Sequence, residues 1–237
     1  MAISIDTIYQ RVLALANKEQ RGYITPQEFN LFANQAQQEI FEQYFYALNQ
    51  ATRIPGNDYV YADIDSMLEE KLQIFDFEDD NTVIGTYANT APNDKILPDY
   101  IYRIHRIELN AVNCEILNVQ DYRDVTEAGA LVKPLPTRPI ANIRNNVVRV
   151  FNGNFTIPTM IYYFRKPTQV RWAYFVINDK ALHDTSALNT VNFELHDSEE
   201  SELVYKILKF AGISMKRDDI MKAGQGMELV QTQQEKQ

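Results

Sequence analysis

The hydrophobic residues of this chain change their spacing twice, and this change limits the folds that are open to it. Up to about residue 80 they recur at steps of three and four, which is typical of amphipathic helices. Between residues 81 and 196, runs of β-branched and aromatic residues are separated by prolines and asparagines, a pattern typical of strands and turns. Helical spacing returns near Asp197. We therefore expect an α+β fold in which a β-rich insertion interrupts a helical bundle.

The N-terminal bundle, which we place at residues 1–80, should begin with two helices. The first runs from about Asp6 to Lys18, and its apolar face carries Ile8, Val12, Leu15 and Ala16. The second runs from about Pro26 to Gln50, and its apolar stripe contains Phe29, Phe32, Ala33, Ala36, Ile40, Tyr44 and Ala47. An aromatic stripe at this spacing indicates a protein core rather than a ligand site.

The second helix also has a second apolar side near its end, formed by Phe41, Phe45 and Leu48. A helix that is apolar on two sides must be covered on two sides. We therefore expect this second side to be covered as well as the first.

The segment between the two helices, NKEQRGYITPQEF (17–29), has the glycine and glutamate spacing of a calcium-binding EF-hand loop. With Gly22 at loop position 6, however, Arg21 places a cation where the loop needs an oxygen ligand. Residues 25–28 match a capping box instead, with Thr25 as the N-cap and Glu28 returning the hydrogen bond. We therefore expect a tight turn between two helices, and a calcium-responsive helical module is kept as an alternative.

A third helix is expected at 66–75, with Met67, Leu68 and Leu72 facing inward, followed by an acidic solvated loop at 76–81. The insertion, residues 81–196, should contain strands at 82–87, 102–109, 114–119, 146–151 and 159–166, and a short helix after Asp121. A further hairpin is expected to join strands at 172–179 and 190–197. We expect this insertion not to be a second globular domain.

The C-terminal part should consist of a helix at 197–215 and a docking tail at 216–237. The apolar stripe of the helix contains Leu203, Val204, Ile207, Leu208 and Ala211, and Gly212 should end it. The stripe of the tail contains Ile220, Met221, Met227, Leu229 and Val230. Gly224 and Gly226 each cost a helix about 1 kcal/mol relative to alanine. A helix this marginal should become ordered on a partner.

No catalytic motif is visible, and we expect no enzyme, no cofactor and no metal site. The sequence has no phosphate-binding loop, no HExxH and no G-x-S-x-G. His105, His183 and His196 are dispersed, and His196 with the next two residues cannot form a triad, because adjacent side chains cannot take triad roles. That triplet should be a helix entry. The single Cys114 excludes an intramolecular disulfide and should be a buried apolar residue.

The net charge of −9 argues against a general nucleic-acid binder, which needs a basic surface. Four aromatic residues interleaved with three cations could form a base-stacking platform: Tyr162, Tyr163, Phe164 and Trp172 with Arg165, Lys166 and Arg171. We favour a strand with an aromatic inner face and cationic edges. The N-terminal residues lack the basic and apolar regions of a signal peptide, and no apolar run is long enough to span a membrane.

Parts of the chain resemble a known family. YITPQEFNLFANQAQQEIFEQYFYALNQ (23–50) resembles the N-terminal hairpin of head-to-tail connector proteins of tailed bacteriophages, in particular the ring proteins of crAss-like phages. ILPDYIYRIHRIELN (96–110) resembles the leucine-proline segment of the adaptor proteins of short-tailed phages. ELVYKILKFAG (202–212) and the tail to Gln237 are similar to that family's C-terminal helix and portal-docking extension.

The resemblance implies a virion structural protein of the head-to-tail neck, made in the host cytoplasm. The family implies a homo-oligomeric ring, commonly a dodecamer, stacked under the portal protein, with the β-rich part facing the next tail or ring protein. Genomic DNA would pass through the channel at ejection without specific binding, since an acidic wall does not hold phosphates. The expected partner interface comprises Phe41, Phe45, Leu48, Ile220, Met221, Met227, Leu229 and Val230. Another tail or baseplate scaffold protein is the alternative.

Overall fold

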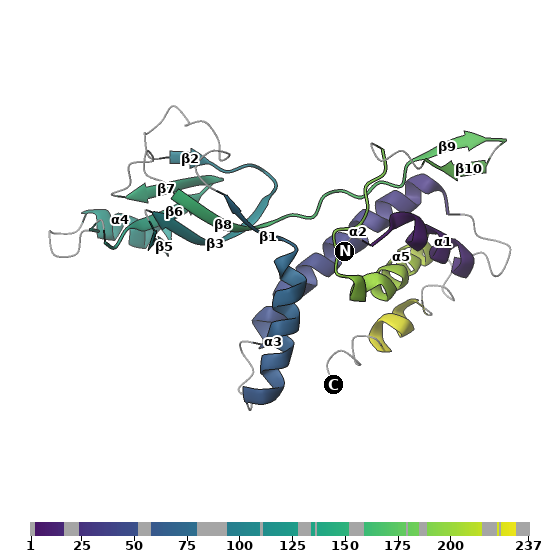
Figure 1. Ribbon diagram of the computed structural model, residues 1–237, viewed down its shortest axis with the longest axis horizontal. Coiled ribbons are helices and arrows are strands. Elements are labelled where there is room, and N and C mark those ends of the chain that lie inside the picture. Colours follow the sequence, from purple (N-terminus) through teal and green to yellow (C-terminus); the bar gives the residue numbers. More distant parts are fainter. Residues whose placement is uncertain are drawn as a thin grey trace. The chain divides into compact units, whose positions relative to one another are not determined.

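The computed structural model of the chain contains two compact units, one of residues 1–74 and 167–237 and one of residues 75–166 (Figure 1). Each unit is described by itself. Helices dominate the first unit and strands the second, so the expected α+β class is confirmed. The structure describes residues 3–16, 24–51, 58–79, 94–109, 111–127, 134–135, 137–151, 159–178, 180–184, 189–214, 222 and 224–230.

The boundaries of the β-rich unit differ from the expected ones near residues 80 and 196. The unit begins at Phe75, because the acidic segment after it forms a strand rather than a solvated loop. It ends at Lys166, because residues 167–196 pack with the helices. The unit also has a hydrophobic core of its own, so the expectation that it is not a separate globular unit is wrong.

The helical unit is built around α2 (Pro26–Ala51) and α5 (Glu200–Ser214), which pack against each other. The first helix, α1 (Ile5–Ala16), packs on α5, and α3 (Asp58–Gln73) packs on α2. The expected stripes are largely confirmed. Buried members include Ile8 and Val12 of α1, Phe29, Ala33, Ala36 and Ile40 of α2, and Leu203, Val204, Ile207, Leu208 and Ala211 of α5.

Three local expectations for the helices are corrected. Leu15 is 42% exposed and Met67 is 55% exposed, because each lies one residue, about 100° of helix rotation, from a buried position. The third helix begins at Asp58 rather than at residue 66. The last helix continues two residues past Gly212 to Ser214, since a single glycine weakens a helix without having to end it.

Side-chain amides on α2 hold an extended segment, residues 168–172, along the helix. Asn30 donates to the carbonyl of Trp172 (3.2 Å) and accepts from its N–H (2.8 Å). Asn34 makes the same two bonds with Val170, each 2.9 Å long. Gln37 continues the series by donating to the carbonyl of Thr168 (2.8 Å). From Asn30 to Asn34 the helix rises about 6 Å over four residues, and the extended segment rises by a similar length over the two residues from Val170 to Trp172, so the two spacings match for this pair.

The segment after these bonds forms the hairpin of β9 (Tyr174–Ile177) and β10 (Lys180–His183). The expected partner of the first strand was the segment at 190–197, and this expectation is wrong. Within that segment, Val191 and Phe193 form isolated bridges to Arg171 and Ile3 instead. The strand Lys180–His183 follows β9 after two residues and pairs with it. The sequence around His183 is polar and was therefore predicted to be a loop rather than a strand.

The second unit contains two four-stranded sheets that share one core. The first sheet has the order β1 (Asp76–Asp79), β8 (Thr159–Arg165), β3 (Ile101–Leu109) and β4 (Val112–Asn113), all antiparallel. The second has the order β2 (Asp94–Ile96), β7 (Val147–Phe151), β6 (Ile140–Arg144) and β5 (Glu115–Leu117). The core includes Ile107, Leu109, Ile161 and Tyr163 from the first sheet and Ala141, Val148 and Val150 from the second.

The expected strands at 102–109, 146–151 and 159–166 are confirmed within one or two residues. The segment expected as a strand at 114–119 ends early, since β5 stops at Leu117 and α4 (Val119–Glu127) follows. The connection through α4 makes β5 and β6 a parallel pair, which needs such a crossover. The turn between β6 and β7 has positive φ at Asn145 and Asn146, as a tight hairpin turn requires. Residues 82–87 lie outside the described residues.

Cys114 belongs to this shared core, as expected. It lies among Leu109 and Val150 in the same buried cluster. Burial, and then the nearby carboxylate of Glu108, raise the pKa of the Cys114 thiol to about 11. A thiol that stays protonated at neutral pH is a poor nucleophile.

Candidate functional site

A helical segment at residues 224–230, defined here as the strap, packs against α5 in the helical unit. Gly224 is buried, and a Cβ added to it would lie 3.2 Å from the backbone nitrogen of Lys209 and 3.2 Å from the carbonyl oxygen of Tyr205. Any larger residue would therefore be crowded by the α5 backbone and would require a shift of a few tenths of an ångström. In Figure 1 the strap, in yellow, is the last helical segment before the C-terminus.

Glu228 binds the strap to α5 through two lysines. Its Oε1 lies 2.8 Å from the Nζ of Lys206, and its Oε2 lies 3.0 Å from the Nζ of Lys209. Both contacts are hydrogen-bonded ion pairs, which are the strong class of polar contact. Burial opposes ionisation of Glu228, but the hydrogen bonds and charges of the two lysines outweigh it and lower its pKa.

Lys206 also faces a second carboxylate, on its own helix. Its Nζ lies 3.3 Å from the Oε1 of Glu202, and both side chains are almost fully buried. Burial, and also the neighbouring Glu199, raise the pKa of Glu202 to about 7, although Lys206 opposes this shift. Burial alone would lower the pKa of Lys206, but its bonds to Glu228 and Glu202 raise it overall.

The charged cluster extends from the strap to α3. Glu199, at the end of the short 3-10 helix η2 (Asp197–Glu199), is 1% exposed and lies 2.5 Å from the Nζ of Lys71. Lys71 also lies 5.8 Å from the ring centre of Tyr44 on α2. Buried charges cost several kcal/mol each unless they are paired. Sequence reasoning missed this cluster, although the lysine and glutamate of α5 interrupt its apolar stripe.

The outer side of the strap is apolar and exposed. Met227 is 43% exposed, Leu229 is 64% exposed and Val230 is 54% exposed. These three expected interface residues therefore lie on a surface that another protein could contact. The other two members of the expected stripe, Ile220 and Met221, lie outside the described residues.

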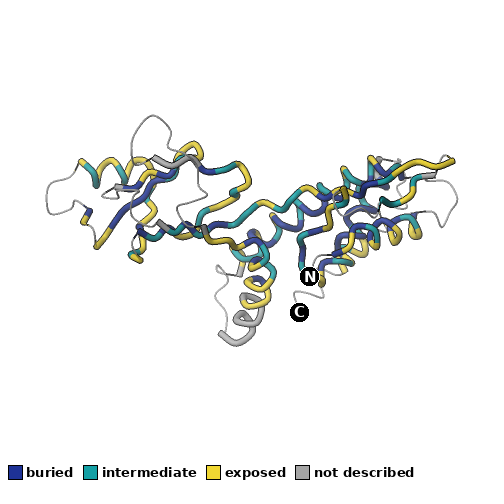
Figure 2. The backbone as a smooth tube through the Cα atoms, turned by 45° about the horizontal axis from the view of Figure 1, so that its top comes forward, coloured by how far each residue is buried: buried dark blue, intermediate teal, exposed yellow. Residues whose placement is uncertain are grey.

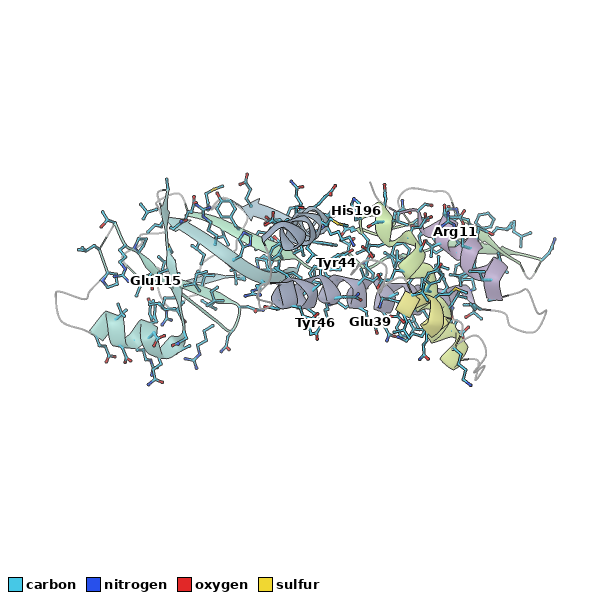
Figure 3. All side chains as sticks on the ribbon, turned by 90° about the horizontal axis from the view of Figure 1, so that it is seen from below. Arg11, Glu39, Tyr44, Tyr46, Glu115 and His196 are labelled. Carbon is cyan, nitrogen blue, oxygen red and sulfur yellow. The ribbon has the colours of Figure 1, made fainter. Side chains whose placement is uncertain are left out.

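The expected interface residues on α2 are corrected by the structure. Phe41 is fully buried and Phe45 nearly so, and their rings form an edge contact at 5.1 Å. Leu48 is half-buried. The chain itself covers this second side of α2, so Phe41 and Phe45 do not form a partner surface. The exposed apolar residues of α2 are instead Leu31 and Tyr46, and Figure 3 shows Tyr46 and the buried Tyr44 on different sides of the helix.

The β9–β10 hairpin is a second exposed apolar surface of the helical unit. Phe175, Val176 and Ile177 are all exposed, and so is Leu182 on the facing strand (Figure 2). Its base is well anchored, because Trp172 is buried and its Nε1 donates to Asp6 (3.0 Å). The sequence pattern predicted a strand here but did not reveal that three successive apolar residues face solvent.

The capping box between the first two helices is confirmed. The N–H of Thr25 donates to the Oε2 of Glu28 (3.0 Å), and the N–H of Glu28 donates to the Oγ1 of Thr25 (3.3 Å). Glu28 is therefore engaged at the start of α2. Residues 17–23 of the EF-hand-like segment lie outside the described residues, and the described part contains no cluster of three or more metal-ligating side chains.

The histidines do not form a common site. His196 caps η2, since its side chain accepts from the N–H of Ser198, so the expected helix entry is confirmed. His183 stacks on Trp172 with ring centres 5.6 Å apart, and His105 lies beside Phe164 in the other unit. His196 and the two residues after it therefore have a structural role, as the start of η2.

The aromatic and cationic residues at 162–172 do not form one platform. Tyr163 is buried in the core of the β-rich unit, whereas Trp172 is buried in the helical unit. Arg165 lies over the ring of Phe77, 4.9 Å from its centre. This arrangement agrees with a strand that has an aromatic inner face.

No protein-family model matches the chain, and no match is found among curated proteins either. Within the described residues, none of the helices has both the length and the apolar character needed to cross a membrane. The connector hypothesis therefore rests on the sequence segments and on the surfaces described above.

Proposed function

We propose that this chain is a virion structural protein of the phage head-to-tail neck, which forms a connector ring between the portal and the tail. The ring would enclose a channel through which the genome passes. The strap would contact the portal, and the exposed hairpin would contact a neighbouring copy.

The observation that carries the proposal is the two-sided character of the strap. One side is held to α5 by Glu228, while Met227, Leu229 and Val230 on the other side are exposed. Burying one such side chain contributes about 1.5–3 kcal/mol. A positioned segment with a free apolar side favours a docking role over a purely internal one.

The β9–β10 hairpin supports contact between copies. A two-stranded hairpin is marginally stable by itself, and both of its edges have unpaired backbone groups. Exposed apolar residues on such a hairpin favour aggregation unless another surface covers them. A neighbouring copy in a ring would supply that cover at every hairpin.

Cryo-electron microscopy of the particle that contains this chain tests the proposal. We expect a closed ring beneath the portal, with residues 224–230 against the portal and β9–β10 against the next copy. A ring elsewhere in the tail would support the alternative of a tail or baseplate scaffold. Single copies with no channel would overturn both.

Deletion of residues 216–237 supplies a second test. The shortened chain should keep a cooperative thermal transition but no longer join the particle. Loss of the cooperative transition would show that the tail belongs to the folded core instead, and incorporation of the shortened chain would exclude a docking role.

A further inference from the structure

Two carboxylates from different elements face one buried ammonium group. Glu202 of α5 and Glu228 of the strap approach the Nζ of Lys206 at 3.3 Å and 2.8 Å. Lys206 is 4% exposed, so water can do little to replace a lost partner. Lys206 can be neutralised by Glu202 or by Glu228, depending on which of the two carboxylates is ionised and in contact with its Nζ.

We propose that the strap is a detachable latch, in which Glu202 and Glu228 compete for Lys206 and the competition sets how firmly the strap is held on α5. The strap is released when Glu202 neutralises Lys206 from within α5. It stays docked when Glu228 is the charged partner. The proposal concerns contacts within one chain and does not depend on the proposed function.

The contacts between strap and α5 are of a kind that can be broken. Gly224 contributes a close backbone approach without a side chain, and Glu228 contributes ion pairs. The three apolar residues of the strap that are exposed gain little from this position. Docking therefore depends strongly on charge, and charge pairing can change without unfolding the helices.

The groups around the competing carboxylates define the expected charge balance. Glu199 of η2 is a second carboxylate near Glu202 that helps to raise the pKa of Glu202, and it is itself paired with Lys71 of α3. Lys209 of α5 holds the other oxygen of Glu228. From α1, Arg11 reaches α5 at Glu200 (3.1 Å), away from Lys206. From α2, the ring of Tyr44 faces Lys71.

The direction of the pH dependence follows from linkage. When Glu228 is docked, its negative charge offsets part of the attraction between Lys206 and an ionised Glu202. The pKa of Glu202 is therefore higher in the docked state than in the released state. A proton on Glu202 must then favour docking by the same free energy. Since the pKa of Glu202 is about 7, docking should weaken as the pH rises through neutrality. In acid, docking is lost only when Glu228 is protonated, below its usual pKa.

Hydrogen–deuterium exchange of the full chain at pH 6 and pH 8, corrected for the intrinsic exchange rate, tests the latch. Backbone amides at 224–230 should exchange faster at pH 8, by roughly fivefold if the coupling is one pKa unit. In Glu202→Gln the rate should be the same at both pH values. In Glu228→Gln exchange should be fast at both.

The matched control is Glu42→Gln, which removes an exposed carboxylate from α2 and should behave like the wild type. Peptides from α2 in the same digest report any unfolding of the whole unit. If Glu228→Gln unfolds the unit, Gly224→Ala replaces it, because a Cβ there is crowded by the α5 backbone and should loosen the strap without changing any charge. Wild-type protection in both strap variants would overturn the proposal, as would an unchanged pH dependence in Glu202→Gln.

Discussion

Three side-chain amides on α2 act as the edge of a β-sheet. Asn30, Asn34 and Gln37 satisfy backbone groups of residues 168–172 that would otherwise need a partner strand. A buried backbone group without a partner costs about 1–3 kcal/mol. These amides lie beside the apolar stripe of α2, where a spacing of four and three is the sequence signal that could have revealed them.

Asn34→Ala should therefore lower the free energy of unfolding by roughly 1–3 kcal/mol, because it removes both bonds to Val170. Chemical denaturation followed by circular dichroism measures this change. The control is Gln35→Ala, whose side chain bonds to Glu39 on the exposed side and should change stability little. Equal effects of the two substitutions would contradict the role assigned to Asn34.

Glu202 should make the stability of the helical unit depend on pH. Its pKa is about 7 in the folded chain against 4.5 ordinarily, so the folded state binds more protons between these values. Stability should thus be fully present below pH 4.5 and should fall as the pH rises towards 7.

Glu202→Gln should remove this dependence and stabilise the protein at pH 8 by roughly 2 kcal/mol, with little effect at pH 5. Thermal denaturation at the two pH values measures the difference. A variant that is equally destabilised at both would show that Glu202 is needed in its charged form.

At the scale of elements, the strap combines two glycines with opposite surroundings. Gly224 lies against the backbone of α5, whereas nothing lies within 4 Å of a Cβ added at Gly226. Alanine favours a helix over glycine by about 1 kcal/mol at either position. Alanine at Gly226 therefore tests helix propensity alone, whereas alanine at Gly224 also tests the packing of the strap on α5.

Gly226→Ala should strengthen the strap and slow its hydrogen exchange by up to roughly fivefold, which corresponds to about 1 kcal/mol. Gly224→Ala should speed the same exchange, because the close contact outweighs the gain in propensity. If both substitutions slow exchange, the strap is not packed tightly on α5.

At the scale of the whole molecule, the chain enters and leaves the β-rich unit at neighbouring points. The N–H of Arg165 donates to the carbonyl of Phe75 (2.9 Å), and β1 pairs with β8 along its length. The unit has its own core and its ends lie together, which are the properties of a domain that can be excised.

A fragment of residues 75–166 should fold by itself. Its two-dimensional amide NMR spectrum should be dispersed, and it should unfold cooperatively on heating. A matched variant, in which a short flexible linker joins Ile74 to Pro167, should keep the helical unit folded. A collapsed spectrum for the fragment would show that its core needs the helical unit.

The sequence by itself determined the features that arise between residues close along the chain: the helix stripes, the Thr25–Glu28 cap and the α+β class. Only the tertiary structure decided which strand pairs with β9, that the chain covers Phe41, that Asn34 holds a backbone 136 residues away, and that Glu228 reaches Lys206. Periodicity reports which side of an element is apolar, because that depends on local geometry. What covers that side, and which buried charge meets its partner, depends on packing between elements, which local spacing does not encode.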